Sequence, residues 1–127
     1  MNWESKRVLV TGSAGVIGRV LVDLLAQQGA EILSVDKKSD ATIEPEVIHI
    51  QADLAREVPP QLREFDPHVV MHLAAEFERT SEEPGYWKVS FENNPLLSNK
   101  ILRALENTTS LEAYIFASSY LIYDPSL

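Results

Sequence analysis

The sequence has 127 residues, 45% of them hydrophobic, and its 11 basic and 19 acidic residues leave a net charge of −8. That length suits one domain with a hydrophobic core, and the acidic balance argues against nucleic acid or an anionic membrane as a partner. The absence of cysteine excludes disulfides, thiolate metal sites and a thiol nucleophile. The apolar runs are shorter than a membrane span and residues 1–7 lack a signal-like segment, so we expect a cytoplasmic protein.

The first predicted elements are a buried strand, a tight turn and a helix. Val8 to Val10 form a short apolar run, and Thr11 to Ala14 are small residues suited to the turn. From Gly15 to about Gln28 the apolar residues recur at helical spacing, and Gly29 suits the left-handed position after a helix. The stripe that we expect on the core side of this helix consists of Val16, Ile17, Val20, Leu21, Leu24 and Leu25.

Three glycines at intervals of three make this turn suitable for binding a pair of phosphates. The first N–H groups of a helix are unpaired and lie at the positive end of the helix dipole. Gly12 permits the sharp turn, Gly15 lets a pyrophosphate approach the backbone, and Gly18 lets the helix lie close to the sheet. The turn is not a P-loop, because the required Gly-Lys-Ser/Thr ending is absent and Gly18 is followed by Arg19.

Residues 30–36 predict a second buried strand, which ends in a carboxylate. Asp36 follows Gly18 by 18 residues, close to where a Rossmann unit places the acid that binds the adenosine ribose. Such a carboxylate repels a 2′-phosphate and so favours NAD over NADP. Lys37 and Lys38 oppose that preference, because basic residues there could grip the extra phosphate. The alternative is that Asp36 merely opens a surface turn.

The middle of the chain predicts a loop over residues 37–45, a third strand over 47–51 and a short helix over 61–65, after the breaker Pro59-Pro60. Residues 67–75 predict a fourth strand. His68 and His72 lie four apart in it with no third ligand nearby, so we expect no metal site.

The last third of the chain predicts a charged loop over residues 76–84, a long helical segment over about 85–107 and a fifth strand over 114–117. Pro95 removes a helix hydrogen bond and disfavours helix at the residue before it. The alternative to one continuous helix is therefore a new helix that starts at Pro95, with Asn93 or Asn94 as its cap.

Three motifs resemble the short-chain dehydrogenase/reductase superfamily, and in particular its extended branch, the nucleotide-sugar epimerases and dehydratases. They are the first turn TGSAGVIG, the stretch His72-Leu73-Ala74-Ala75, and residues 116–123, which are similar to the family signature FxSSxxVYG. Asp124 stands where the family usually has glycine. The resemblance implies an α/β fold, a Rossmann-like doubly wound parallel sheet of order 3-2-1-4-5. Residues 1–127 would form its NAD(P)-binding domain, truncated after the fifth strand, without the later strands and the substrate domain.

The resemblance also assigns roles to particular residues. The residues that would contact the cofactor are Gly12, Gly15, Val16, Ile17, Gly18, Asp36, Lys37, Asp53, Leu54, Leu73, Ala74 and Ala75. Asp53 and Leu54 would flank the adenine, although Asp53 is equally suited to capping a helix. Ser119 would hydrogen-bond the substrate hydroxyl that is oxidised. Asn94 would support the active site through water, since it precedes Ile101-Leu102 by seven residues, whereas Ser90 fits the family's distance from Pro84; we favour Asn94.

The implied function is the NAD-binding portion of an enzyme that transfers hydride to and from a sugar carbon of a nucleotide sugar. The family's general base is the tyrosine of a YxxxK motif, and no tyrosine in this sequence has lysine four positions later. We therefore expect residues 1–127 alone to bind NAD and to be inactive. The alternatives are a non-enzymatic dinucleotide-sensing or scaffold domain and a reductase of a non-sugar carbonyl compound. Many members pair through a four-helix bundle that would include residues 85–107, which leaves a homodimer open, and an exposed fifth-strand edge would also invite self-association.

Overall fold

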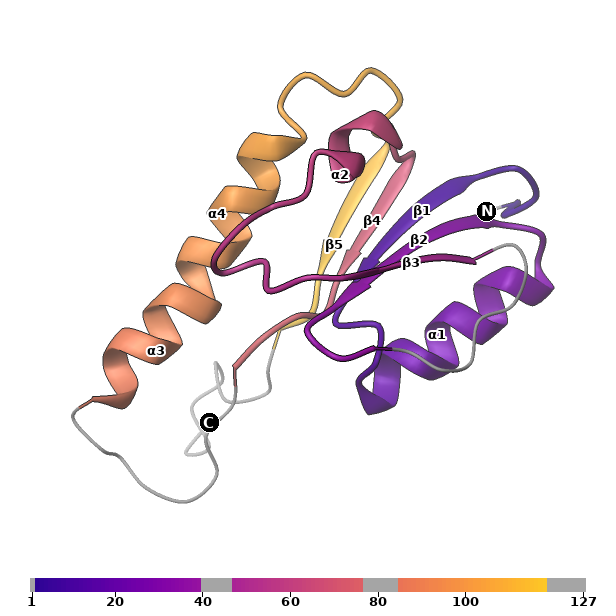
Figure 1. Ribbon diagram of the computed structural model, residues 1–127. Coiled ribbons are helices and arrows are strands. Elements are labelled where there is room, and N and C mark those ends of the chain that lie inside the picture. Colours follow the sequence, from indigo (N-terminus) through magenta and orange to yellow (C-terminus); the bar gives the residue numbers. More distant parts are fainter. Residues whose placement is uncertain (1, 40–46, 77–84, 119–127) are drawn as a thin grey trace, which may run out of the picture.

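The computed structural model describes residues 2–39, 47–76 and 85–118, in which strands and helices alternate along the chain (Figure 1). The elements are β1 (Arg7–Thr11), α1 (Val16–Gln27), β2 (Glu31–Asp36), β3 (Val47–Gln51), α2 (Gln61–Glu64), β4 (Val69–His72), α3 (Tyr86–Asn93), α4 (Pro95–Ala104) and β5 (Ala113–Phe116). The predicted strands and the short helix are confirmed within a few residues. The fourth strand is shorter than predicted, because the chain leaves the ladder after His72.

The strands form one parallel sheet of order β3-β2-β1-β4-β5, which confirms the predicted doubly wound arrangement. The chain moves outward from β1 to β3 and then crosses back to place β4 on the other side of β1. The strand order thus reverses between β1 and β4, and in such sheets ligands bind beyond the carboxyl ends of the strands at that point.

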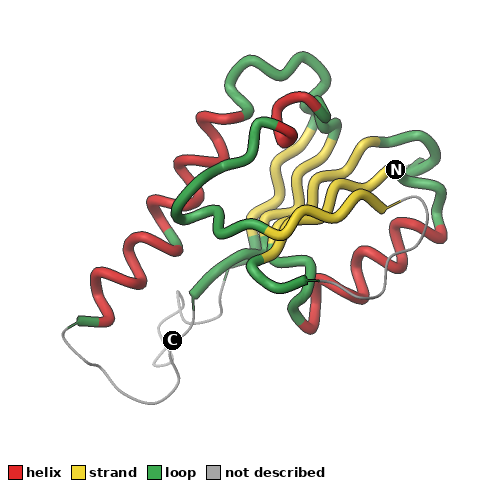
Figure 2. The backbone as a smooth tube through the Cα atoms, viewed as in Figure 1, coloured by secondary structure: helices red, strands yellow, loops and turns green. Residues whose placement is uncertain are grey.

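Helices cover both faces of the sheet (Figures 1 and 2). On one face, Val22 and Leu25 of α1 pack with Val8 and Val10 of β1 in the first core cluster. The second cluster joins Leu62 of α2 and the α4 residues Leu97 and Ile101 to the intervening strand residues, among them Leu9 and Val70. Successive strand residues point to opposite faces, so a strand buried on both sides carries a continuous apolar run, as β1 does over Val8–Val10 and β4 over Val69–Met71.

The apolar stripe predicted for α1 is wrong for four of its six residues. Leu25 is buried and Leu21 is half-buried, but Val16, Ile17, Val20 and Leu24 are 89%, 70%, 58% and 54% exposed. The buried face instead comprises Gly18, Val22 and Leu25. Gly18 sets this rotation, because a Cβ at Gly18 would lie 2.2 Å from the carbonyl oxygen of Gly12. Residues four and seven positions after Gly18 share its face and therefore meet the sheet.

The long helical segment is divided in two, as the alternative with a new helix at Pro95 predicts. Helix α3 ends at Asn93, and α4 begins at Pro95, with Asn94 between them as the N-cap position. The side chain of Asn94 makes no capping hydrogen bond to α4. Proline is tolerated at the first position of a helix because its missing N–H has no partner there.

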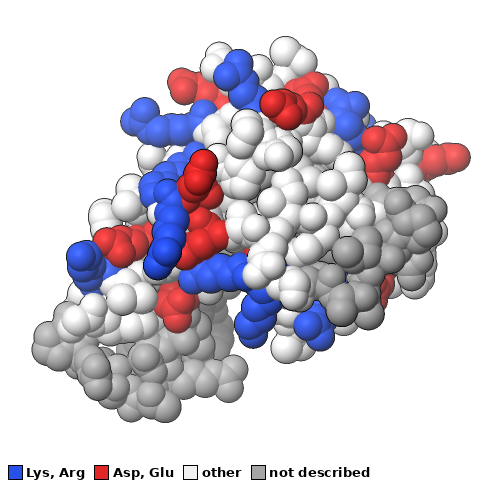
Figure 3. Space-filling view, in the orientation of Figure 1, with Lys and Arg blue, Asp and Glu red and all other residues white. Residues whose placement is uncertain are grey.

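Charged side chains of both signs are interspersed over the face of the molecule drawn in Figure 3. Of the helices within the described ranges, none combines the length and apolarity that crossing a bilayer requires. Nor does the described part of the chain gather three or more His, Asp or Glu side chains into a cluster able to hold a metal ion.

Candidate functional site

The glycine turn after β1 packs so closely that neither Gly12 nor Gly18 has room for a side chain. Gly12 has a φ of +74°, and a Cβ there would lie 2.7 Å from the backbone nitrogen of Ala74. The backbone N–H of Gly12 donates to the carbonyl of Val35, which ties the turn to β2. At Gly15 a Cβ would meet only the carbonyl oxygen of Gly12, at 3.2 Å, and Gly15 lines a cavity. The turn is therefore tight on its protein side and open at Gly15.

Asp36, the last residue of β2, connects that strand to the glycine turn. Its Oδ2 accepts a hydrogen bond from the backbone N–H of Ala14 at 3.0 Å, and its Oδ1 accepts one from the N–H of Lys38 at 2.9 Å. The carboxylate is thus held at the rim of the cavity by two backbone donors. A carboxylate has about four lone-pair sites, so both oxygens retain capacity for a ligand.

Residues 73–76, which follow β4, form the opposite wall and are held at both ends. The N–H of Leu73 donates to the carbonyl of Thr11 at 3.0 Å, and that of Ala74 to Oγ1 of Thr11 at 3.3 Å. At the other end, Asn94 accepts from the N–H of Glu76 at 2.9 Å and donates to its carbonyl at 3.2 Å. This bidentate contact gives Asn94 a direct positioning role for the wall.

Asn94 and Ser90, the two residues predicted as alternatives for the position beside the active site, contact each other. Nδ2 of Asn94 also donates to Oγ of Ser90 at 3.1 Å, one helical turn earlier. Asn94 is therefore the residue that contacts the wall, and Ser90 contacts Asn94. The cavity itself is lined by Asn93, for which the sequence indicated only a role as a helix cap.

His72 lies beneath the wall and is 1% exposed. Its Nδ1 is 2.7 Å from Oγ1 of Thr11, and its Nε2 is 2.8 Å from Oγ of Ser98 on α4. Burial lowers its pKa from 6.5 to about 4. His72 is therefore neutral near pH 7, with one ring nitrogen donating and the other accepting, and it links β1, β4 and α4.

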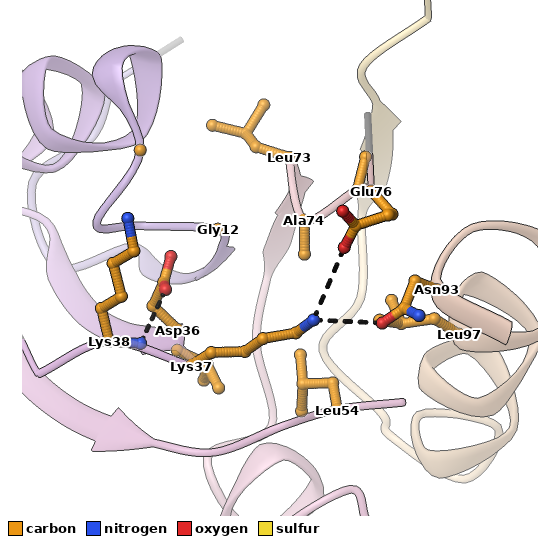
Figure 4. Close-up of a pocket in the computed structure, with 13 residues that line it drawn as sticks. Gly12, Asp36, Lys37, Lys38, Leu54, Leu73, Ala74, Glu76, Asn93 and Leu97 are labelled. Carbon is orange, nitrogen blue, oxygen red and sulfur yellow. Dashed lines mark hydrogen bonds and ion pairs between the residues drawn. The ribbon is translucent and has the colours of Figure 1, made fainter. Parts of the chain in front are cut away.

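These elements surround a cavity of about 660 Å³, drawn in Figure 4, a volume within the range of small-molecule sites. Its lining residues come from the glycine turn, the end of β2, the segment after β3, the wall and the two helices: Gly12, Gly15, Val35, Asp36, Lys37, Lys38, Leu54, Leu73, Ala74, Ala75, Glu76, Asn93 and Leu97. The cavity lies at the switch point between β1 and β4.

Some of the residues predicted to contact the cofactor are not among those that line this cavity with their atoms. Val16 and Ile17 point to solvent on α1, and Gly18 is buried beneath the turn. Asp53 lines a neighbouring groove of about 480 Å³, and its Oδ1 accepts from the N–H of Ala55 at 3.1 Å, as a turn-capping residue does. Ser119 lies outside the described residues.

The cavity also includes residues that the sequence analysis did not assign to the site. Glu76 and Asn93 approach each other from segments 17 residues apart, and Lys37 reaches both of them (Figure 4). Glu76 directly follows the motif His72-Leu73-Ala74-Ala75, which is the one local signal that could have indicated it. Asn93 carries no such signal, because its proximity depends on where α3 lies.

Comparison with known proteins identifies relatives of this arrangement. The model of the NAD dependent epimerase/dehydratase family matches residues 8–127. The chain is 33% identical over 91 residues to UDP-glucose 4-epimerase of Mycolicibacterium smegmatis, which covers 63% of this chain and 29% of that protein. Epimerase Mth375 from Methanothermobacter thermautotrophicus has a similar structure, with a TM-score of 0.81 and 27% identity, over 93% of this chain and 36% of that one.

A structure with bound NAD is also similar. It is a short-chain dehydrogenase/reductase superfamily protein from Agrobacterium tumefaciens, with a TM-score of 0.70 and 26% identity over 89% of this chain and 32% of that one. The chain thus spans between 29% and 36% of the length of these three relatives. Because the family match extends over residues 8–127 and the fold agrees, the chain belongs to the NAD dependent epimerase/dehydratase family.

Proposed function

We propose that residues 1–127 form the NAD-binding domain of a nucleotide-sugar epimerase or dehydratase. The observation that carries the proposal is the cavity at the switch point, which is lined by the glycine turn, by Asp36 and by the wall 73–76. Relatives named as an epimerase and as an NAD complex support the same assignment.

The residues present fit a dinucleotide. Its pyrophosphate would lie along Gly12, Gly15 and Ile17, where no side chain caps the amino end of α1 and the backbone N–H groups of its first turn point outward. The small side chains of Ala74 and Ala75 leave room for the middle of the cofactor. Leu54 would pack on the adenine, and Asp53 would stand beside it at the neighbouring groove.

Asp36 favours NAD over NADP. The two ribose hydroxyls of NAD are donors that a carboxylate accepts, whereas the 2′-phosphate of NADP carries a negative charge that the carboxylate repels. Because Ala14 and Lys38 hold the carboxylate in place through their backbone N–H groups, it cannot easily turn away from the repulsion.

The proposed chemistry is hydride exchange with a sugar carbon, for which the bound nicotinamide supplies the hydride acceptor. Ser119 would orient the sugar hydroxyl, and Asn94 would hold the wall against which the cofactor rests. A tyrosine in YxxxK, which the sequence does not contain, would serve as the base. We therefore propose that this chain binds NAD but does not by itself turn over a nucleotide sugar.

We further propose a cytoplasmic location, and a homodimer through α3 and α4. The exposed Trp87 and Phe91 on α3 and Leu102 on α4 support the homodimer, because aromatic residues are enriched at the centres of protein interfaces.

A titration of the 127-residue chain with NADH, followed by nicotinamide fluorescence, tests the site. We expect saturable binding, and a dissociation constant about tenfold higher in Asp36→Asn, since one charge-assisted contact to the ribose is weakened. Asp23→Asn is the matched control, because Asp23 is an exposed acid on α1 outside the cavity.

Three results would each contradict one part of the proposal. No NADH binding at millimolar concentration would overturn the proposed site, and tighter binding of NADPH than of NADH would overturn the role of Asp36. Turnover of UDP-glucose by the chain alone would contradict the expected inactivity.

A further inference from the structure

Lys37 bridges the candidate cofactor cavity. It follows Asp36 at the end of β2, and its ammonium lies 3.1 Å from Oδ1 of Asn93 on α3 and 3.8 Å from Oε2 of Glu76 on the wall. Figure 4 shows the side chain running across the cavity toward both partners, and away from the side on which Lys38 lies. Three segments that are distant in the sequence thus meet at one ammonium group.

Each partner of this bridge is itself fixed. Nδ2 of Asn93 donates to the carbonyl of Val89 at 2.8 Å, which turns its Oδ1 toward Lys37. The backbone of Glu76 is held by two hydrogen bonds with Asn94, one donated by the N–H of Glu76 and one by Nδ2 of Asn94. The carbonyl of Lys37 accepts from Nε2 of Gln51 at 3.0 Å, so the lysine also starts from an anchored position.

The position of Lys37 gives the bridge a consequence for cofactor choice. A lysine directly after the ribose-binding carboxylate is within reach of a 2′-phosphate, and its charge would favour NADP. Here that charge is directed to the far wall, where it faces the carboxylate of Glu76 and Oδ1 of Asn93. The ribose side of the cavity therefore retains Asp36 without the ammonium of Lys37, and of the two lysines Lys37 and Lys38 only Lys38 lies on that side (Figure 4).

We propose that Glu76 and Asn93 are specificity-determining residues, which favour NAD by holding Lys37 away from the ribose. This inference rests on the proposed dinucleotide site. It places part of the cofactor discrimination on the wall and on α3, across the cavity from the strand that ends in Asp36.

The effect is expected to be moderate, because the side chains of Lys37 and Glu76 are 52% and 37% exposed and water screens the pair. We expect Glu76→Gln to raise the affinity for NADPH relative to NADH about fivefold, since the released ammonium can turn to the 2′-phosphate. Asn93→Ala removes an acceptor without changing the net charge, and should move the ratio in the same direction by about twofold.

The experiment measures dissociation constants of NADH and NADPH for the 127-residue chain and its variants. Glu76→Gln also removes a negative charge, which by itself would favour NADPH. The double variant Lys37→Met/Glu76→Gln, compared with Lys37→Met alone, separates the two causes, because a gain that requires the lysine disappears once Lys37 has been replaced. Glu92→Gln is the control for removing a negative charge from α3. Oε1 of Glu92 lies 4.0 Å from Nζ of Lys88, and Glu92 does not line the cavity.

An unchanged NADPH to NADH ratio in Glu76→Gln would overturn the inference, and so would an equal gain with and without Lys37. Either result leaves the proposed function intact as long as the unmodified chain binds NADH. Loss of NADH binding in the unmodified chain would instead remove the proposed function itself. Circular dichroism of each variant verifies that the fold is retained.

Discussion

His72 is a titratable residue that is almost fully buried, at 1% exposure. Its ring lies between Thr11 and Ser98, and the rings of Tyr114 and Phe116 are 6.1 Å and 5.5 Å from it, centroid to centroid. Burial disfavours its charged form and lowers its pKa to about 4, and burial also raises the pKa of Tyr114 to about 12. The neutral ring holds Thr11, which in turn accepts from Ala74 in the cofactor wall.

His72 should make stability depend on pH. In the unfolded chain it is protonated below pH 6.5, whereas the folded protein binds that proton only near pH 4. The free energy of unfolding should therefore decrease as the pH is lowered from 6.5 to 4, by up to about 3 kcal/mol. Urea unfolding at several pH values measures this slope, which His72→Asn should remove and the control His49→Asn should retain.

The carboxylate Asp66 contributes in a different range, so it does not obscure the result. Hydrogen bonds from the side chain of Ser110 and the backbone of Thr109 lower its pKa from 3.8 to about 2. Its stabilising effect is complete above pH 3.8 and is lost as the pH falls toward 2. A slope between pH 6.5 and 4 that persists in His72→Asn would contradict the assignment to His72.

Among the elements, α1 shows how one glycine determines the face of a helix. A helix that is rich in Val and Leu has several apolar faces, and the spacing of these residues does not show which of the faces is buried. The contact of Gly18 with the backbone of Gly12 and Ser13 makes that choice, because no residue with a side chain fits there.

Two valines on α1 test this rotation directly. Val22 is 6% exposed and Val20 is 58% exposed. We expect Val22→Ala to lower the free energy of unfolding by about 2 kcal/mol, because it leaves a cavity against the sheet, and Val20→Ala to change it by less than about 0.5 kcal/mol. Equal or reversed losses in thermal or urea unfolding would show that α1 faces the sheet differently.

For the whole molecule, the open edge of the sheet is the feature with the clearest consequence. Strand β5 pairs with β4 on one side, and in the described part of the chain no strand pairs with its other side. Ile115 and Phe116 on this strand are exposed. Unpaired edges with apolar side chains promote association between chains.

We therefore expect the 127-residue chain to associate through β5 in addition to the proposed pairing through α3 and α4, with a sedimentation coefficient that rises with concentration. Ile115→Lys should reduce this association, because a charged residue on an edge strand opposes pairing. Phe91→Lys is the comparison for the route through α3 and α4. If Phe91→Lys abolishes association and Ile115→Lys does not, the helices rather than the strand edge join the chains.

Local signals in the sequence predict the order and type of the elements, with the division between α3 and α4 as one of two alternatives. The glycine spacing, the alternation into Asp36, the break at Pro95 and the motif at His72 are signals carried by adjacent residues, and they indicated strands, turns and helix ends, whereas the sheet order came from the family resemblance. These signals are local because turns, caps and strand ends depend on the backbone conformation of a few neighbours. The resemblance to a family with the same motifs supplied the connection between them.

Contacts between side chains that are distant in the sequence depend on the tertiary structure. The rotation of α1 chooses one of several apolar faces of that helix. The two hydrogen bonds between Asn94 and Glu76, and the bridge from Lys37 to Glu76 and Asn93, join segments that are distant in the sequence. Such contacts depend on how the crossover places α3 and α4 over the carboxyl edge of the sheet. The residues that line the cavity come from segments far apart in the sequence, and packing of the elements brings them together.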